Sequence, residues 1–189
     1  TNRIEMLQGG KITYYTFPVV RGKNVAQLSD NENIEQIIDA CKPDIVHIFG
    51  TEYAHTLAAV NVCNKKNVQV VISIQGLVSV YAQHYMAGLP EKVQRGFTVK
   101  EFIKQSNLKQ QQKKFGKRGE YEISALQKVD HIIGRTTWDK ACIKQINPKA
   151  QYHYCNENLR PEFYKHVWDL NKCKKHSIFV SQGSYPIKG

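Results

Sequence analysis

The chain has 189 residues, of which 41% are hydrophobic, and it carries a formal net charge of +11. This length suits one domain with a core of its own. No run of about 18 apolar residues and no signal peptide is present, so we expect no membrane span and a cytoplasmic location. The five cysteines are scattered without a Cys-x-x-Cys pair, which indicates reduced thiols rather than disulfides or a zinc site.

The segment from residue 29 to residue 74 predicts two helices alternating with two strands. The apolar residues of the first helix fall at i, i+3, i+4 and i+7, and they are Ile34, Ile37, Ile38 and Cys41. Residues 29–31 offer caps for this helix, and Pro43 ends it. Strands follow at 44–49 and 68–74, separated by a helix. Since both strands are apolar almost without interruption, we expect a parallel sheet buried on both faces by helices.

The rest of the chain continues this alternation. The further predicted elements are a possible strand at 12–17, a helix at about 120–129, a strand at 131–134, a helix capped by Thr136 or Thr137 and ended by Asn147-Pro148, a strand at 151–155 and a helical turn at 161–164. Repeated βαβ order of this kind predicts an α/β fold, a Rossmann-like parallel sheet with helices on both faces.

Most of the positive charge lies in one segment, residues 92–118. It holds nine basic residues against the single acid Glu101, which gives +8. A solvated helical face explains such a segment, and so does an anionic membrane surface or a phosphate-bearing substrate. The aromatic residues there are too sparse for a base-stacking platform, so we expect no nucleic acid, although a basic RNA-binding domain remains an alternative.

Polar residues follow the predicted strands at their carboxyl ends, where open α/β sheets bind ligands. Strand by strand, these residues are His47, Gly50, Glu52 and His55; Gln75 and Gly76; Arg135 and Thr136; Asn156 and Glu157. Because several strand ends are polar at once, the sequence predicts a ligand cleft at this edge.

Each of these residues also has a structural interpretation. His47 could be a hydrogen-bonded core histidine, Glu52 a first-turn acid at a helix dipole, and Thr136 a helix cap. Arg135 directly follows an apolar strand, so its guanidinium must either pair with an anion or lie at the protein surface. His47 and His55 lack the spacing of a paired-histidine zinc site, so we expect no metal. The chain contains no Gly-x-Ser-x-Gly, Walker or Gly-x-Gly-x-x-Gly motif.

Four segments together resemble the N-terminal half of a retaining GT-B glycosyltransferase of the family-4 group, of the kind that serves bacterial polysaccharide and lipid glycosylation. They are Lys42-Pro-Asp-Ile-Val-His-Ile-Phe-Gly, Val71-Ile-Ser-Ile-Gln-Gly-Leu, Val129-Asp-His-Ile-Ile-Gly-Arg-Thr and Ile178-Phe-Val-Ser-Gln-Gly-Ser-Tyr-Pro-Ile-Lys-Gly. The similarity covers most of the chain from about residue 33 onward.

The resemblance implies an acceptor-side domain at 1–175 and, at 176–189, the first strand and loop of a donor-binding domain. A UDP- or GDP-linked sugar would be the donor substrate, without a further cofactor, and a glycan or lipid-linked molecule the acceptor. Lys188 and Gly183 match positions at the donor diphosphate. The resemblance further implies an enzyme that works in the cytoplasm, peripherally at the inner membrane face. The chain as given would then be inactive alone.

The chain departs from the family pattern at three places. Gln75 stands where many members have a histidine or an acid near the transferred sugar, so its catalytic role is weak. Residues 156–158 replace the usual Asn-Gly, and no glycine-rich loop follows the first strand, as if the natural beginning were missing. A non-catalytic α/β binding module therefore remains a second alternative.

Overall fold

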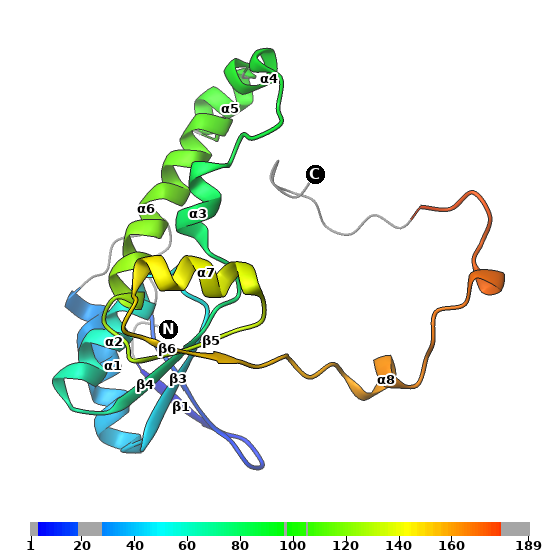
Figure 1. The fold of residues 1–189 in the computed structure, drawn as a ribbon. Helices are drawn as coiled ribbons and strands as arrows, with labels where there is room; N and C mark the ends of the chain where they lie inside the picture. Colours follow the sequence, from blue (N-terminus) through cyan, green and yellow to red (C-terminus); the bar gives the residue numbers. More distant parts are fainter. Residues whose placement is uncertain (1–3, 19–27, 97, 105, 179–189) are drawn as a thin grey trace.

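A four-stranded parallel sheet forms the centre of the molecule, with strand order β3-β4-β5-β6 (Figure 1). The computed structural model describes residues 4–18, 28–96, 98–104 and 106–178. The sheet strands are β3 (Ile45–Phe49), β4 (Gln69–Ser73), β5 (His131–Gly134) and β6 (Gln151–Tyr154). This sheet, flanked by helices, confirms the predicted Rossmann-like α/β class.

A separate antiparallel pair precedes the sheet. It joins β1 (Glu5–Gln8) to β2 (Thr13–Thr16). The strand predicted at 12–17 is therefore present, but it belongs to this hairpin and not to the parallel sheet. The sequence analysis missed β1, a strand of two polar and two apolar residues that are exposed or half-buried.

The main core lies between the sheet and one layer of helices. This layer consists of α1 (Leu28–Cys41), α2 (Ala54–Lys65), the end of α6 (Leu108–Leu126) and α7 (Thr137–Ile146). The helices bury Ile38, Val60, Leu126 and Ile143 against strand residues such as Ile72. Burial of each such side chain stabilises the fold by about 1.5–3 kcal/mol.

The second face of the sheet differs from the prediction of helices on both faces. Only β4 is buried throughout most of its length. In the edge strand β3, Ile45 is 54% exposed and Phe49 is 68% exposed, while Val46 and Ile48 pack against the core. Since side chains alternate along a strand, within the described ranges the helices that build the core cover one face of β3 and leave the other open.

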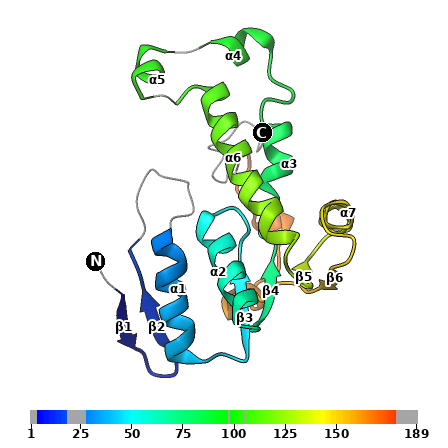
Figure 2. The ribbon, with the colours of Figure 1, turned by 90° about the vertical axis from the view of Figure 1, so that its left-hand side faces the viewer.

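A helical finger, defined as residues 78–126, projects from the sheet (Figure 2). In it α3 (Val78–Gln83) packs along α6, and the short helices α4 (Glu91–Arg95) and α5 (Val99–Lys104) form the far end. The helix predicted at about 120–129 in fact begins at Leu108, because Asn107 and Gln110 form a capping box there.

Helices α3 and α6 of the finger approach closely at Gly119. A Cβ atom placed on Gly119 would lie 2.6 Å from Ser79 Cα of α3. No larger residue fits this position without a shift of the backbone, so the glycine sets how closely α3 and α6 pack.

Beyond β6 the chain runs away from the sheet through α8 (Pro161–Tyr164) and the 3-10 turn η1 (Leu170–Lys172) (Figure 1). The predicted helical turn at 161–164 is confirmed. Gly183, Lys188 and most of the strand predicted from Ser177 lie outside the described residues. Throughout the part of the chain that is described, every helix is too short or too polar to cross a membrane.

Candidate functional site

A cavity of about 610 Å³ lies at the carboxyl edge of the parallel sheet, and we call it the edge cleft. Strands β3, β4 and β5 contribute to it, together with the residues that directly follow β6. The lining residues are His47, Phe49, Ser73, Ile74, Gln75, Ile133, Gly134, Arg135, Cys155, Asn156, Glu157 and Asn158. The position is the one at which open α/β sheets bind ligands. Of the predicted site residues, His47, Gln75, Arg135, Asn156 and Glu157 are thus brought together.

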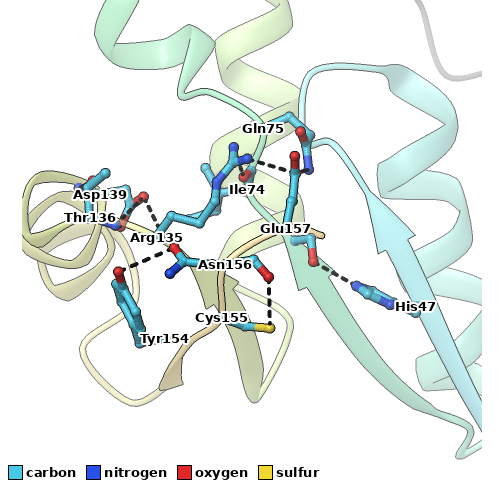
Figure 3. A network of polar contacts seen from close by, with 11 residues as sticks. His47, Ile74, Gln75, Arg135, Thr136, Asp139, Tyr154, Cys155, Asn156 and Glu157 are labelled. Carbon is cyan, nitrogen blue, oxygen red and sulfur yellow. Dashed lines mark hydrogen bonds and ion pairs between the residues drawn. The ribbon is translucent and has the colours of Figure 1, made fainter. Parts of the chain in front are cut away.

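One carboxylate joins three of the strand ends (Figure 3). Glu157 Oε1 lies 2.7 Å from Arg135 NH1 and accepts a hydrogen bond of 2.8 Å from Gln75 Nε2. Arg135 NH2 also donates to the carbonyl of Ile74 at 3.3 Å. The Arg135 side chain is 31% exposed and that of Glu157 is 52% exposed, so both groups face the solvent of the cleft. Gln75 and Arg135 therefore form a pair of donors suited to a carboxylate or phosphate oxygen.

The backbone at Arg135 is held by the buried Asp139 of α7. The Asp139 carboxylate accepts hydrogen bonds from Arg135 N at 3.1 Å, from Thr136 N and from Tyr152 Oη at 2.5 Å. Burial alone would raise the pKa of Asp139, but these hydrogen bonds together outweigh it and lower the pKa below its ordinary value. Arg135 is thus placed by a rigid helix start.

Thr136 proves to be the helix cap that its structural interpretation suggested. Its Oγ1 accepts from Asp139 N at 3.1 Å, the Asp139 side chain returns to the Thr136 backbone, and the residue does not line the edge cleft. Asp139, three residues after Thr136, is the sequence signal for this capping box.

His47 is exposed on the open face of the sheet, so its interpretation as a core histidine is wrong. Its Nε2 lies 2.7 Å from Ser73 Oγ on the neighbouring strand. Its ring centroid lies 4.1 Å from that of Phe49. The sequence analysis missed Phe49, because a phenylalanine at the end of an apolar strand looks like a core residue.

Besides Thr136, four predicted residues do not line the edge cleft. Gly50 is buried at φ +93°, a conformation that favours glycine, and donates to Ser73 O at 3.0 Å. Gly76 accepts from Thr51 Oγ1 at 3.1 Å. Glu52 is half-buried outside the cleft, and His55 stacks on the Tyr53 ring with a centroid distance of 5.2 Å. These residues shape the neighbouring loops and are not brought into the cleft.

A second buried acid, Glu122 of α6, supports the loops behind the edge cleft. Its carboxylate is fully buried and accepts hydrogen bonds from Ser79 N at 2.9 Å, Ser79 Oγ at 2.6 Å, Val78 N at 3.1 Å and Thr51 Oγ1. The sequence analysis did not single out Glu122. The signal was its spacing, because Gly119, Glu122, Ala125 and Leu126 share one helix face.

No known protein family matches this chain, and no curated protein is significantly similar to it. Among residues 4–18, 28–96, 98–104 and 106–178, no three histidine, cysteine or acidic side chains are grouped so as to hold a metal ion. The fold and the site therefore define a class only, an α/β sheet domain with a cleft of apolar and polar side chains at the carboxyl edge of its strands. Gly183 and Lys188, the predicted donor-phosphate residues, lie outside the described residues.

Proposed function

We propose that the chain is the acceptor-side domain of a glycosyltransferase that moves a sugar from a UDP- or GDP-sugar to a glycan or lipid-linked acceptor. The observation that carries the proposal is the composition of the edge cleft. Phe49, 68% exposed, lies in the same cavity as the Gln75 and Asn156 amides and the Arg135–Glu157 pair. The resemblance of the four sequence segments supplies the reaction type.

This set of groups matches the chemistry of a saccharide. A sugar ring has an apolar face of C–H groups, which packs on an aromatic ring, and hydroxyl groups at its rim that both donate and accept hydrogen bonds. Phe49 offers the aromatic ring. Amides and carboxylates such as those of Gln75, Asn156 and Glu157 supply donors and acceptors at fixed positions. A cavity of about 610 Å³ lies within the range usual for small-molecule sites.

The transfer itself would require a donor domain facing this cleft. Departure of the nucleoside diphosphate places negative charge on its oxygens, and Lys188 with backbone N–H groups near Gly183 would stabilise that charge. Closure of two domains would exclude water, so that transfer to the acceptor competes with hydrolysis. In this reaction the edge cleft would orient the acceptor hydroxyl towards the anomeric carbon, with retention of its configuration.

Acceptor binding can be tested on the chain itself. Titration with a panel of oligosaccharides, followed by backbone amide shifts, should move the resonances of Gln75, Arg135 and Asn156. Phe49→Ala should weaken binding by about tenfold, as expected for loss of an aromatic contact of 1–1.5 kcal/mol. Phe163→Ala, which changes a phenylalanine 62% exposed in α8, is the matched control and should have no effect. Shifts that avoid the edge cleft would contradict the proposal.

Turnover separates the enzyme from the alternative of a non-catalytic binding module. The 189-residue chain should release no UDP or GDP from nucleotide-sugars, whereas the chain extended by a donor domain should do so. In that extended enzyme, Lys188→Ala should lower kcat by about 10²–10³-fold, as loss of a positioned electrostatic contact does. An extended chain that binds saccharides without any turnover would favour the binding module.

A further inference from the structure

The far end of the finger carries charge and apolar side chains together. We call the segment 91–109 the finger tip; its helices α4 and α5 lie at the end farthest from the sheet (Figures 1 and 2). Its basic residues are Lys92, Arg95, Lys100, Lys104 and Lys109, and its acids are Glu91 and Glu101. The finger tip therefore has a net charge of +3 and lies well outside the core.

The few acids of the finger tip are already engaged. Glu91 pairs with Arg95 at 3.0 Å, and Glu101 accepts hydrogen bonds from Thr98 N and Oγ1 at 2.7 and 2.9 Å. None of the ion pairs formed between described residues involves Lys100, Lys104 or Lys109. The positive field of these lysines is therefore directed into solvent.

Three aliphatic side chains stand exposed between these charges. Val99 is 76% exposed, Ile103 is 74% exposed and Val93 is 50% exposed. Val99 and Ile103 are four residues apart on α5, so they share one face of that helix. At the end of a projecting element these aliphatic side chains are not buried in the core, and their exposure to water is unfavourable.

The finger tip also contains a small hollow. It has a volume of about 230 Å³ and is lined by Gln94, Arg95, Gly96, Asn107 and Lys109. Arg95 is paired with Glu91, whereas Lys109 takes part in no ion pair between described residues, so Lys109 is the cation of this lining that can attract a phosphate oxygen. The hollow therefore places Lys109, a cation outside the described ion pairs, in the same finger tip as the exposed aliphatic residues.

From these observations we infer that the finger tip docks on an anionic phospholipid surface, with Val99 and Ile103 inserted among the acyl chains and the lysines at the headgroups. Basic residues around a small apolar face are the pattern of interfacial membrane contacts. The finger would then hold the sheet and its edge cleft away from the bilayer surface, at a distance set by the length of the finger.

The exposed aliphatic residues favour a lipid surface over RNA. Binders of single-stranded RNA place aromatic rings against bases, whereas Val93, Val99 and Ile103 are aliphatic; Phe97 and the side chain of Phe102 lie outside what the structure describes. Valine and isoleucine have no planar face on which a base could stack, whereas they partition readily into hydrocarbon. Both partners would respond to salt, so salt dependence alone does not distinguish them.

Vesicle co-sedimentation of the 189-residue chain tests the inference. Binding to phosphatidylcholine vesicles should rise strongly when phosphatidylglycerol is included, and it should weaken as salt is added. Lys100→Gln with Lys104→Gln should lower the partition coefficient about thirtyfold, because each basic side chain near an anionic surface contributes about fivefold. Val99→Ser with Ile103→Ser should lower it about tenfold at the same charge.

Matched controls change similar residues elsewhere on the surface. Lys144→Gln with Lys149→Gln removes the same charge from α7 and the loop after it, and Val167→Ser with Leu170→Ser changes aliphatic residues 90% and 69% exposed beyond α8. Both control pairs should bind vesicles nearly as the parent chain does. Thermal unfolding of every variant verifies that the fold is kept.

Three results would overturn the inference. The first is equal binding to vesicles with and without phosphatidylglycerol. The second is vesicle binding that Val99→Ser with Ile103→Ser leaves unchanged, because insertion would then be absent. The third is tight binding of polyuridine RNA that displaces the vesicles and depends on Lys100 and Lys104 alone, which would assign the finger tip to nucleic acid.

Discussion

The two ends of α6 lie in different surroundings, the core of the domain and the projecting finger. Its inner end packs on α2 and α3 and buries Gly119, Glu122 and Leu126. Its outer half carries Lys109, Lys113 and Lys117, all exposed, and leads to the finger tip. The inner end is positioned by a buried carboxylate and a close glycine contact, so single substitutions there should disturb the fold. On the outer half Phe115 packs on the buried Tyr85, but the three lysines are exposed, so substitutions of these lysines should change only what the surface binds.

The largest effect is expected at Glu122. Glu122→Ala leaves two backbone N–H groups and two hydroxyls without their acceptor in the interior, and it opens a cavity. We expect a loss of about 3–5 kcal/mol in the free energy of unfolding. Chemical denaturation followed by circular dichroism measures it.

Two further variants separate the hydrogen bonds of Glu122 from its volume. Glu122→Gln keeps the shape but turns one acceptor into a donor, so its cost should lie between those of Glu122→Ala and the parent chain. Glu120→Ala, on the exposed side of α6, should change the free energy of unfolding by less than about 0.5 kcal/mol. Equal stability of the Glu122 and Glu120 variants would show that the buried carboxylate does not anchor the finger.

The next effect contrasts two glycines of α6. Gly119→Ala forces a methyl group against Ser79 of α3 and should destabilise the chain by about 1–3 kcal/mol. Gly116→Ala meets no atom within 4 Å and replaces a weak helix former, so it should stabilise the chain by about 0.5–1 kcal/mol. Melting temperatures of the two variants should therefore move in opposite directions. A shared direction would mean that the close approach of α3 and α6 is absent.

The sequence predicted the positions of the strands better than it predicted which of their faces are buried. All four strands of the parallel sheet were located, and the continuous apolar runs at 44–49 and 68–74 gave the clearest signal for a buried strand. The same runs predicted cover on both faces of the sheet, which Phe49 contradicts. Exposure of an apolar residue depends on which helices pack over the strand, and the sequence of β3 does not contain that information.

The candidate site was likewise predicted only in part. His47, Gln75, Arg135, Asn156 and Glu157 were identified because strand ends meet at one edge of a parallel sheet. Contacts between distant segments were not predictable, since nothing local links Gln75 or Arg135 to Glu157. Glu122 was missed for the same reason, because its partners lie about 40 and 70 residues away.

A smaller effect is expected at Asp139, the buried acid that holds the start of α7. The lowered pKa of Asp139 means that its ionised form stabilises the folded state at a pH above the ordinary carboxyl pKa. That contribution is lost as the pH falls through the lowered, folded-state pKa. Asp139→Asn should therefore cost roughly 1 kcal/mol near neutral pH, from weaker hydrogen bonds to Arg135 N and Tyr152 Oη.

The pH dependence distinguishes this role from simple packing. Unfolding free energies of the parent chain and of Asp139→Asn should converge as the pH falls from about 6 to about 2. Tyr152→Phe, which removes one donor and keeps the carboxylate, should retain part of the pH dependence. A difference between the parent chain and Asp139→Asn that stays constant over this range would contradict a role for the ionised carboxylate.

The smallest effect on stability is expected at the finger tip. Lys100→Gln with Lys104→Gln removes two exposed charges from a segment that holds an excess of positive charge, so it relieves repulsion and breaks no described ion pair. The free energy of unfolding should change by less than about 0.5 kcal/mol in either direction. The same variant should lose most of its binding to anionic vesicles, which Glu120→Ala should leave unchanged. A change in stability above 1 kcal/mol, roughly the scale of a lost hydrogen bond, would show that the lysines support the finger itself, and the contrast between the two ends of α6 would not hold.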